Sequence, residues 1–304
     1  MSASCVSVVN NNVMTKFLLL FLMFATNVFA QQQPVMFEPG SISDNGVFGF
    51  TLSPDGNEAF WVKSNGGRDT LYIMRSVKVK GKWKTPELAS FSTASALWND
   101  IDPMFSPDGN TVLFQSTRPV DGKPERKGFD IWAVKRTATG WGEAYHLGNV
   151  VNTDASESFA SMAKNGNIYF MKQNPNGKDS SDLFVSRYDQ GAYQEPENLG
   201  KPVNTSFRES NPWISADEDY IIYFSSDTTG HGSVDLMLSR RSNNSWSKPV
   251  NLGRPINSET GEFCPFYHEK EKRLYFSRTT VTPAKRRIEN IYWIKFDPGK
   301  VERK

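Results

Sequence analysis

The sequence predicts an all-β fold made of repeated four-stranded antiparallel units, and three observations indicate it. A short turn sequence recurs about every 50 residues, and strand-like apolar runs follow each copy of that turn. The chain also contains 21 Phe, 10 Tyr, 8 Trp, 22 Gly and 17 Pro among its 304 residues. This composition favours short strands and turns, and it argues against disorder, a coiled coil or a helical bundle.

The first element is a leader at residues 1–30. Lys16 precedes an apolar run, Phe17 to Phe29, which ends at Ala30. This arrangement is typical of a secretory signal peptide cleaved after Ala30, and Met14 is an alternative start of translation. No other stretch approaches the roughly 20 apolar residues that a membrane-spanning helix needs. We therefore expect a periplasmic or secreted protein without a transmembrane segment.

The rest of the chain, residues 31–304, is expected to form a single domain because its composition does not change along its length. Removal of the leader takes one lysine, so the net charge falls from +2 to +1. Such a balance argues against a nucleic-acid partner. Cys264 is the sole cysteine after cleavage, which rules out an intramolecular disulfide.

The repeated turn reads Ser-Pro-Asp-Gly at residues 53–56 and again at 106–109. Altered copies begin at residues 163, 215 and 268, so that successive spacings are 53, 57, 52 and 53. After each turn come a strand with an aromatic pair such as Tyr275-Phe276, a loop, a third strand such as 131–135, and a turn closed by an aromatic residue such as Trp141. A fourth strand follows, as at 249–253.

Four antiparallel strands in about 50 residues are typical of a β-propeller blade. We count five blades; six would need a hidden repeat. The last repeat ends after its third strand, and Phe37–Ser43 resembles the end of a fourth strand, so an N-terminal strand is expected to complete the last blade. A closed ring leaves no open sheet edge, which favours a monomer.

The Ser-Pro-Asp-Gly turn, the Tyr-Phe strand and the Gly-x-Trp turn together resemble the WD40-like repeat of TolB-type propellers, over residues 37 to 297. The resemblance implies the propeller fold and leaves the function open, because such propellers serve many functions. Only a short segment precedes the first repeat, so the extra N-terminal domain of TolB itself is missing. No protease domain follows the repeats.

Strand order assigns the loops to two faces. The segments before the first strand and between the second and third strands share one face, here called the near face, and the Ser-Pro-Asp-Gly and Gly-x-Trp turns lie on the far face. We expect the far-face turns to be structural, since Pro, Asp and Gly set turn dihedral angles. The candidate site is therefore expected on the near face.

Alignment of the first strands places acidic residues at one position in four of five blades, where each strand enters the central channel. These residues are Asp100, Glu157, Glu209 and Glu262. Asp102 lies two residues further and, by the two-residue period of a strand, on the same side. Converging carboxylates have raised pKa values, bind a cation such as calcium, or pair with basic groups. Alternatively, each carboxylate bonds the backbone of a neighbouring blade or a water in the channel.

Basic residues are expected around this opening. The second strands end in Lys63, Lys172 and Arg278. The near-face loops add Arg68, Arg126, Lys127, Lys178, Lys285, Arg286 and Arg287. Such a collar would attract an anionic glycan or an acidic protein surface, or it is an ordinary solvated surface. Trp98 on the same face could stack on a sugar ring or pack in the core.

The histidines do not converge, since only His231 lies on a near-face loop, so a histidine metal site is not expected. No His is placed to activate Cys264, which we interpret as a small buried residue. The leading hypothesis is a propeller that binds a glycan, peptide or partner protein at the channel mouth through the acids with Trp98, Lys63, Lys172, Arg278 and His231. The alternative is a glycosidase or polysaccharide lyase that uses the same carboxylates.

Overall fold

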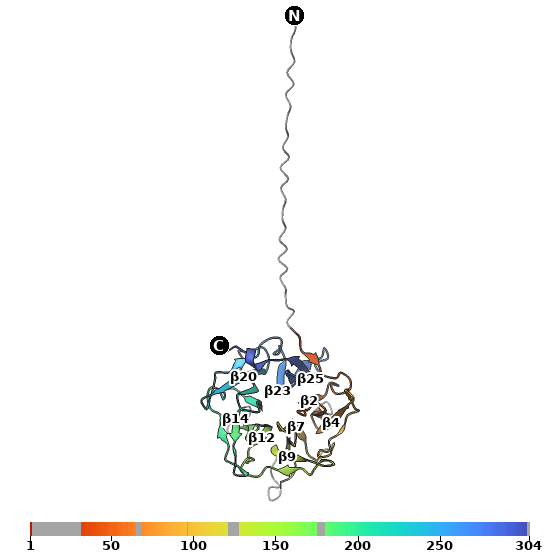
Figure 1. The fold of residues 1–304 in the computed structure, drawn as a ribbon, viewed down its shortest axis with the longest axis vertical. Coiled ribbons are helices and arrows are strands. Elements are labelled where there is room, and N and C mark those ends of the chain that lie inside the picture. The colour runs from red at the N-terminus through yellow and green to blue at the C-terminus, as the bar shows by residue number, and fades with distance from the viewer. Residues whose placement is uncertain (2–31, 65–67, 96, 121–127, 175–179, 303–304) are drawn as a thin grey trace. The chain divides into compact units, whose positions relative to one another are not determined.

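Five antiparallel sheets surround a central axis in the computed structural model, with β2, β7, β12 and β23 nearest the centre (Figure 1). The structure describes Met1 and residues 32–302, except 65–67, 96, 121–127 and 175–179. The three long strands of the blades are β2 (Val47–Leu52), β3 (Glu58–Ser64) and β4 (Leu71–Val79); β7 (Asp100–Phe105), β8 (Thr111–Ser116) and β9 (Asp130–Thr137); β12 (Glu157–Met162), β13 (Ile168–Gln173) and β14 (Ser181–Ser186); β18 (Glu209–Ile214), β19 (Tyr220–Ser225) and β20 (Asp235–Ser242); and β23 (Gly261–His268), β24 (Arg273–Val281) and β25 (Arg287–Lys295). The prediction of an all-β propeller with five blades is confirmed, and no sixth blade is present in the described part.

The outer edges of the first four blades are short two-residue pairings. They are β5 (Lys82–Trp83), β6 (Glu87–Leu88), β10 (Gly140–Trp141), β11 (Tyr145–His146), β15 (Tyr188–Asp189), β16 (Ala192–Tyr193), β17 (Glu197–Asn198), β21 (Ser245–Trp246) and β22 (Val250–Asn251). A 3₁₀-helix, η1 (Pro298–Lys300), follows the last blade. Among the described residues, no helix has the length and apolar composition that a membrane crossing requires. The expected leader and the alternative start at Met14 lie outside the described residues.

An N-terminal strand closes the fifth blade, as the sequence predicts. Strand β1 (Val35–Met36) pairs with β25, and the Phe37 amide donates to the Ile291 carbonyl at 2.8 Å. The paired strand thus begins two residues before the segment expected from the sequence. The ring of Phe37 then packs against Phe50 and Tyr275, with centroid distances of 4.8 and 5.5 Å. The N-terminal segment therefore adds both backbone pairing and aromatic packing to the ring closure.

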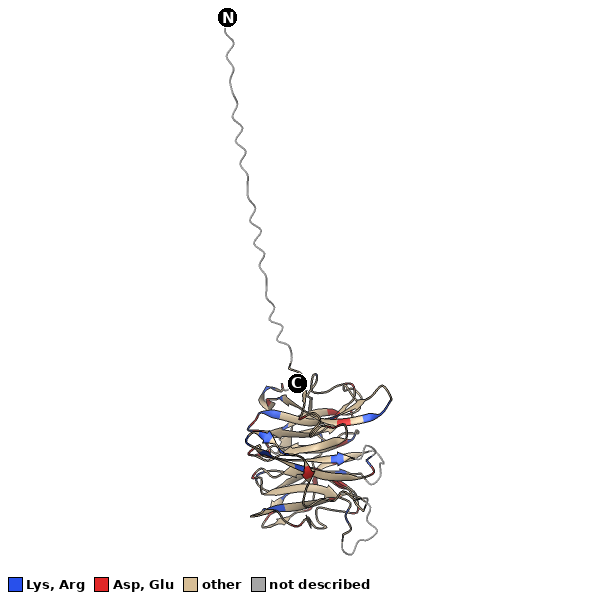
Figure 2. Ribbon diagram, turned by 90° about the vertical axis from the view of Figure 1, so that its right-hand side faces the viewer, with Lys and Arg blue, Asp and Glu red and all other residues tan. Residues whose placement is uncertain are grey.

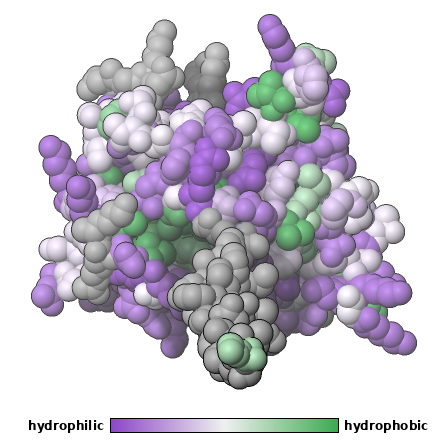
Figure 3. All heavy atoms as spheres, turned by 90° about the horizontal axis from the view of Figure 1, so that it is seen from above, coloured by the Kyte–Doolittle hydropathy of each residue, from purple (hydrophilic) through white to green (hydrophobic). Residues whose placement is uncertain are grey.

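Apolar side chains fill the space between neighbouring blades. Between the first two blades, Phe60, Phe91 and Phe105 form a buried cluster, and Trp141 from the far-face turn covers it. The Trp141 Nε1 donates to Glu58 at 3.0 Å, which satisfies its polar atom. On the visible rim, hydrophobic residues form small patches among hydrophilic ones (Figure 3), and charged residues occupy scattered positions on the strands (Figure 2).

The Ser-Pro-Asp-Gly turns are held by their own side chains, as expected. The Ser53 Oγ donates to Asp55 at 2.5 Å and accepts the Glu58 amide at 2.9 Å. Gly56 has a φ of +77°, a left-handed conformation that glycine adopts without strain. The second copy repeats the first contact between Ser106 and Asp108 at 2.6 Å. These turns therefore set the far-face ends of the strands.

Phe37→Ala should lower the free energy of unfolding by about 3–5 kcal/mol, because it leaves a cavity in the aromatic closure of the ring. Urea denaturation measures this loss. Val35→Ala is the matched control, since Val35 lies in the same strand with 47% of its surface exposed, and it should change stability by less than about 0.5 kcal/mol. Equal effects of the two substitutions would contradict the packing role of Phe37.

Candidate functional site

A β-bulge interrupts the innermost strand of every blade at the same position. In the first blade Phe48 pairs with Val62 and Thr51 with Phe60, so two residues oppose one. The other four blades show the same shift in register. The residue at the bulge has a positive φ in all five blades. These residues are Gly49 (+61°), Asp102 (+49°), Phe159 (+48°), Asn211 (+55°) and Cys264 (+49°).

The bulge separates the two sets of residues that strand alternation places together. An extra residue breaks the two-residue period, so side chains before and after it no longer share a face. Asp100, Glu157, Glu209 and Glu262 are each 0% exposed. Burial encloses these four carboxylates, and their convergence with Asp102 on the channel mouth stays a prediction. Whether they bind a ligand stays a prediction without support from their position.

Three of these acids instead bond the connector that enters their blade. The Glu157 carboxylate accepts from the Thr153 amide at 3.0 Å and from its hydroxyl at 2.5 Å. Glu209 bonds Thr205 in the same way, and Glu262 bonds Ser258. Each partner lies four residues earlier in the chain. These contacts match the alternative interpretation, in which the repeated acid is a structural device.

Two of the three cations predicted at the ends of the second strands act as partners of the repeated acids. Arg278 donates to Glu262 at 2.7 Å, and Lys172 lies 4.0 Å from Glu157. Lys63 pairs with Asp44. Asp100 accepts two bonds from Arg118, at 2.9 and 3.2 Å, although the sequence analysis does not consider Arg118. The partners of Glu262, Glu157 and Asp100 neutralise carboxylates that burial would otherwise destabilise.

Trp98 and His231 lie apart from the bulge residues. The ring of Trp98 faces the Arg118 guanidinium at 5.7 Å, which fits the packing alternative. The exposed His231 lines a separate cavity of about 240 Å³ next to Asp235, whose carboxylate accepts the His231 amide at 2.6 Å. Among the described residues, no three His, Cys, Asp or Glu side chains come together as metal ligands. A bound calcium ion stays a prediction.

The near face of the channel holds a cavity of about 850 Å³, here called the near-face pocket. Three of the bulge residues, Asp102, Asn211 and Cys264, line it. The Cys264 thiol donates to Asp102 Oδ1 at 3.4 Å, and the Cys264 amide donates to Asn211 Oδ1 at 3.1 Å. Bulge positions of three blades thus hold their polar groups in contact.

The pKa of Asp102 is raised to about 6, chiefly because its carboxyl is buried. The charge of Glu289 raises it further, whereas the Cys264 thiol and the Arg68 charge lower it. Burial and the neighbouring Asp102 charge also raise the pKa of the Cys264 thiol well above its usual value. Cys264 therefore stays a thiol at neutral pH, which disfavours a nucleophilic role.

Glu289 also lines the pocket and is held by Arg68. Two bonds join them, at 2.7 and 3.3 Å, and the Arg68 guanidinium lies 4.4 Å from the centre of the Phe48 ring. Alignment of the first strands misses Glu289, because it lies on a third strand, β25. The signal available in the sequence is weak: Ile288 precedes Glu289 and extends the apolar pattern of the last strand, which begins at Arg287, toward the near face.

Part of the expected basic collar lines this pocket. Arg68, Arg286 and Arg287 are members of the predicted set, and Arg208 is an addition that the sequence analysis misses. The Arg208 guanidinium lies 5.2 Å from the centre of the Phe224 ring. Arg126, Lys127 and Lys178 lie outside the described residues. The near-face pocket thus combines four arginines with two acids.

Glu262→Ala should cost about 3–5 kcal/mol of stability, because it removes the partner of Arg278 and the cap of the connector. Chemical denaturation measures this. Glu259→Ala is the control, since Glu259 forms an exposed pair with Arg254, and it should leave the midpoint nearly unchanged. A Glu262→Ala protein of native stability would contradict the structural role.

Asp102→Asn should stabilise the protein at neutral pH. An aspartate whose folded pKa of about 6 exceeds its usual 3.8 binds its proton more tightly when folded, so stability falls between about pH 4 and pH 6 and stays reduced above. The variant should match the native protein near pH 4 and exceed it by up to about 3 kcal/mol at pH 7. Denaturation across this range measures the difference. Asn211→Asp, at the equivalent bulge, adds a second buried carboxyl and should lose stability relative to the native protein as the pH rises. A less stable Asp102→Asn at pH 7 would contradict the assignment.

No protein-family model and no curated protein matches the chain. Similar solved structures include a glycoside hydrolase, with 10% identity, coverage of 90% of this chain and 95% of that one, and a TM-score of 0.57. The endo-arabinase from Bacteroides thetaiotaomicron VPI-5482 has 14% identity, coverage of 89% and 100%, and a TM-score of 0.53. The GH43 endo-arabinanase from Bacillus licheniformis has 12% identity, coverage of 85% and 97%, and a TM-score of 0.52. At these identities the likeness shows the β-propeller fold, which confirms that part of the expected resemblance without showing a TolB-type family.

Proposed function

We propose that the protein binds an anionic oligosaccharide in the near-face pocket. The observation that carries this proposal is the excess of guanidinium groups there: Arg68, Arg208, Arg286 and Arg287 line a pocket with two acids, Asp102 and Glu289. Arginine binds carboxylates through two parallel hydrogen bonds, which suits the acidic groups of uronic acid sugars. Because Arg68 is already paired with Glu289, the other three are the expected contacts of the ligand.

Aromatic side chains in the same pocket support a sugar ligand. Phe48, Phe129, Phe224 and Phe263 line it together with the arginines. Phe48 and Phe224 hold guanidinium groups against their faces, which limits the freedom of Arg68 and Arg208. A pocket with apolar walls and a few fixed polar groups is typical of small-ligand sites. Such walls would contact the apolar faces of sugar rings.

Glycoside hydrolysis is the second candidate function, and the acids of the pocket favour it. Burial raises the pKa of Asp102 to about 6, which suits a proton donor, and Glu289 pairs with Arg68 in the same pocket. Glycosidases use two carboxyl groups, one of which has a raised pKa. The similar propellers described as a glycoside hydrolase and an endo-arabinase add support for a carbohydrate substrate. The other bulge residues supply no further carboxylate.

The cellular setting of this function stays a proposal. The expected leader at residues 1–30 would direct the protein to the periplasm or outside the cell. A peptide or an acidic protein surface, which the sequence analysis also considers, would meet the same arginines. The TolB-type repeat resemblance is compatible with each of these ligands and does not choose between them.

Calorimetric titration with uronate oligomers and neutral oligomers of equal length tests the proposal. The acidic sugars should bind and the neutral ones should not, and affinity should fall as salt rises. Arg208→Ala should weaken binding about tenfold or more, the usual size of a lost charged hydrogen bond. Arg187→Ala is the control, because Arg187 pairs with Glu197 outside the pocket.

Asp102→Asn separates the two candidate functions. If the protein is a hydrolase, this variant should bind the acidic oligomer but release no reducing ends. If it only binds, the native protein should release none either. Equal affinity for neutral and acidic oligomers, or no binding of either, would refute the proposed ligand class.

A further inference from the structure

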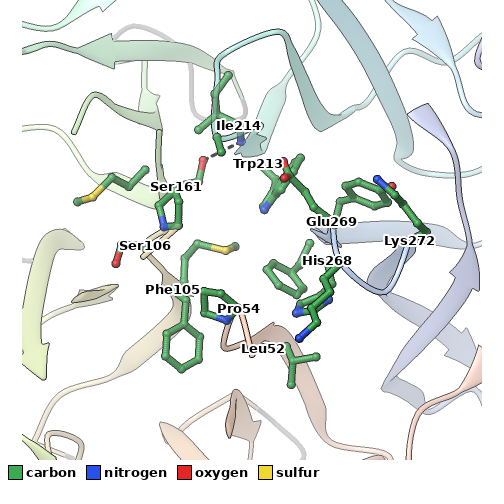
Figure 4. Close-up of a pocket in the computed structure, with 17 residues that line it drawn as sticks. Leu52, Pro54, Phe105, Ser106, Ser161, Trp213, Ile214, His268, Glu269 and Lys272 are labelled. Carbon is green, nitrogen blue, oxygen red and sulfur yellow. Dashed lines mark hydrogen bonds between the residues drawn. The ribbon is translucent and has the colours of Figure 1, made fainter. Parts of the chain in front are cut away.

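A second cavity of about 550 Å³ opens on the far face of the channel, here called the far-face pocket. All five blades contribute to it the residue just before the far-face turn, which is the last or the second-last residue of the innermost strand. These residues are Leu52, Phe105, Met162, Ile214 and Tyr267. Figure 4 shows Leu52, Phe105 and Ile214 placed around the same opening. This position is therefore apolar in every repeat.

The deeper walls of the far-face pocket are apolar as well. Met104, Trp213 and Phe266 line it one residue further into the channel. The turns of the first two blades add Pro54 and Pro107 to its edge. Apolar surface that faces water costs free energy, and covering it with an apolar ligand recovers that cost. The cavity also has a volume typical of small-molecule sites.

Three polar side chains that line this pocket already form hydrogen bonds within the protein. The Ser161 Oγ donates to the Pro212 carbonyl at 2.7 Å and accepts the Ile214 amide at 3.1 Å (Figure 4). The His268 ring bonds the Ser53 carbonyl at 3.1 Å and accepts the Glu271 amide. The Tyr267 hydroxyl donates to Phe296. A polar ligand such as a sugar would find few partners here.

Charged groups lie at one side of the mouth. Lys270 and Lys272, from the turn of the fifth blade, line the pocket with one acid, Glu269. All three side chains belong to exposed residues. An anionic head group at this side would gain from the two lysines while its apolar body fills the channel. The near-face pocket differs, because arginines and acids line it.

We propose that the far-face pocket binds an amphiphile with one apolar chain and an anionic head, of the size of a medium-chain fatty acid. The chain lies against Met104, Trp213 and Phe266, and the head group faces Lys270 and Lys272. This site is separate from the proposed glycan site, since the two pockets share no lining residue.

Displacement of the fluorescent anion 8-anilinonaphthalene-1-sulfonate from the folded protein by dodecanoate tests the proposal. Dodecanoate should displace the dye and raise the thermal midpoint of the native protein. Ala216→Trp places a bulky ring at the mouth, where Ala216 lines the pocket, and it should weaken dodecanoate binding about tenfold or more. The combined change Lys270→Ala and Lys272→Ala should weaken dodecanoate about threefold and leave dodecanol unchanged.

Lys164→Ala is the matched control. Lys164 is an exposed lysine in the far-face turn of the third blade and does not line the pocket, so its loss should leave dodecanoate affinity unchanged. Near-UV circular dichroism checks that each variant is folded. If Ala216→Trp does not fold, the proposal is tested by the dodecanoate affinity of the lysine variants and by the thermal midpoint of the native protein with dodecanoate. Absence of displacement, or equal dodecanoate binding in the Ala216→Trp protein, would overturn the proposed site, and equal loss in Lys164→Ala would overturn the head-group assignment.

Discussion

The crossings from one blade to the next depend on buried side chains that fix the connector. At the end of the second, third and fourth blades an asparagine pairs with the third strand through both of its amide atoms, as Asn204 does with Leu183. The next residue, Thr205, then bonds the carboxylate of Glu209 in the following blade. A buried carboxylate is costly unless it is fully bonded, so the connector and the acid require each other. In the third, fourth and fifth blades this coupling fixes the start of the innermost strand, two residues before the bulge.

The part of the fold that the sequence predicts is the part that local signals determine. Turn chemistry acts within a few residues, so Ser53–Gly56 and its copies locate the far-face ends of the strands, and their spacing gives the number of blades. The closing strand near Phe37 is predictable because the last repeat lacks a fourth strand. The repeated turns do not predict which way the side chains of the innermost strands point. The bulge adds one residue, and no shared sequence signal marks it, because Gly49, Asp102 and Phe159 adopt the same conformation. The two-residue period of a strand therefore does not hold across the bulge.

The candidate sites are predictable only in part, because they depend on contacts between distant repeats. Asp102 is among the expected residues. The ion pair of Arg68 and Glu289 in the same pocket, however, joins the first and the fifth blade, which lie at opposite ends of the chain. The far-face pocket is missed for another reason: the turns beside it are structural, as expected, yet the apolar residues before the turns line a shared space. Both pockets occur where a repeated position carries different side chains. The repeated acids and asparagines, in contrast, hold the same backbone arrangement from one blade to the next.

Ring closure by β1 also constrains the order in which the chain can fold. Ser43 bonds Ile291 across a sequence separation of 248 residues, and β1 pairs with β25, the last strand of the chain. Contacts of such long separation are slow to form. During synthesis, the first four blades can assemble from neighbouring segments, but the segment at Val35–Phe37 has no partner until nearly the whole protein has been made. The earliest strand to emerge is thus the last to be used, and until then the fifth sheet has an unprotected edge.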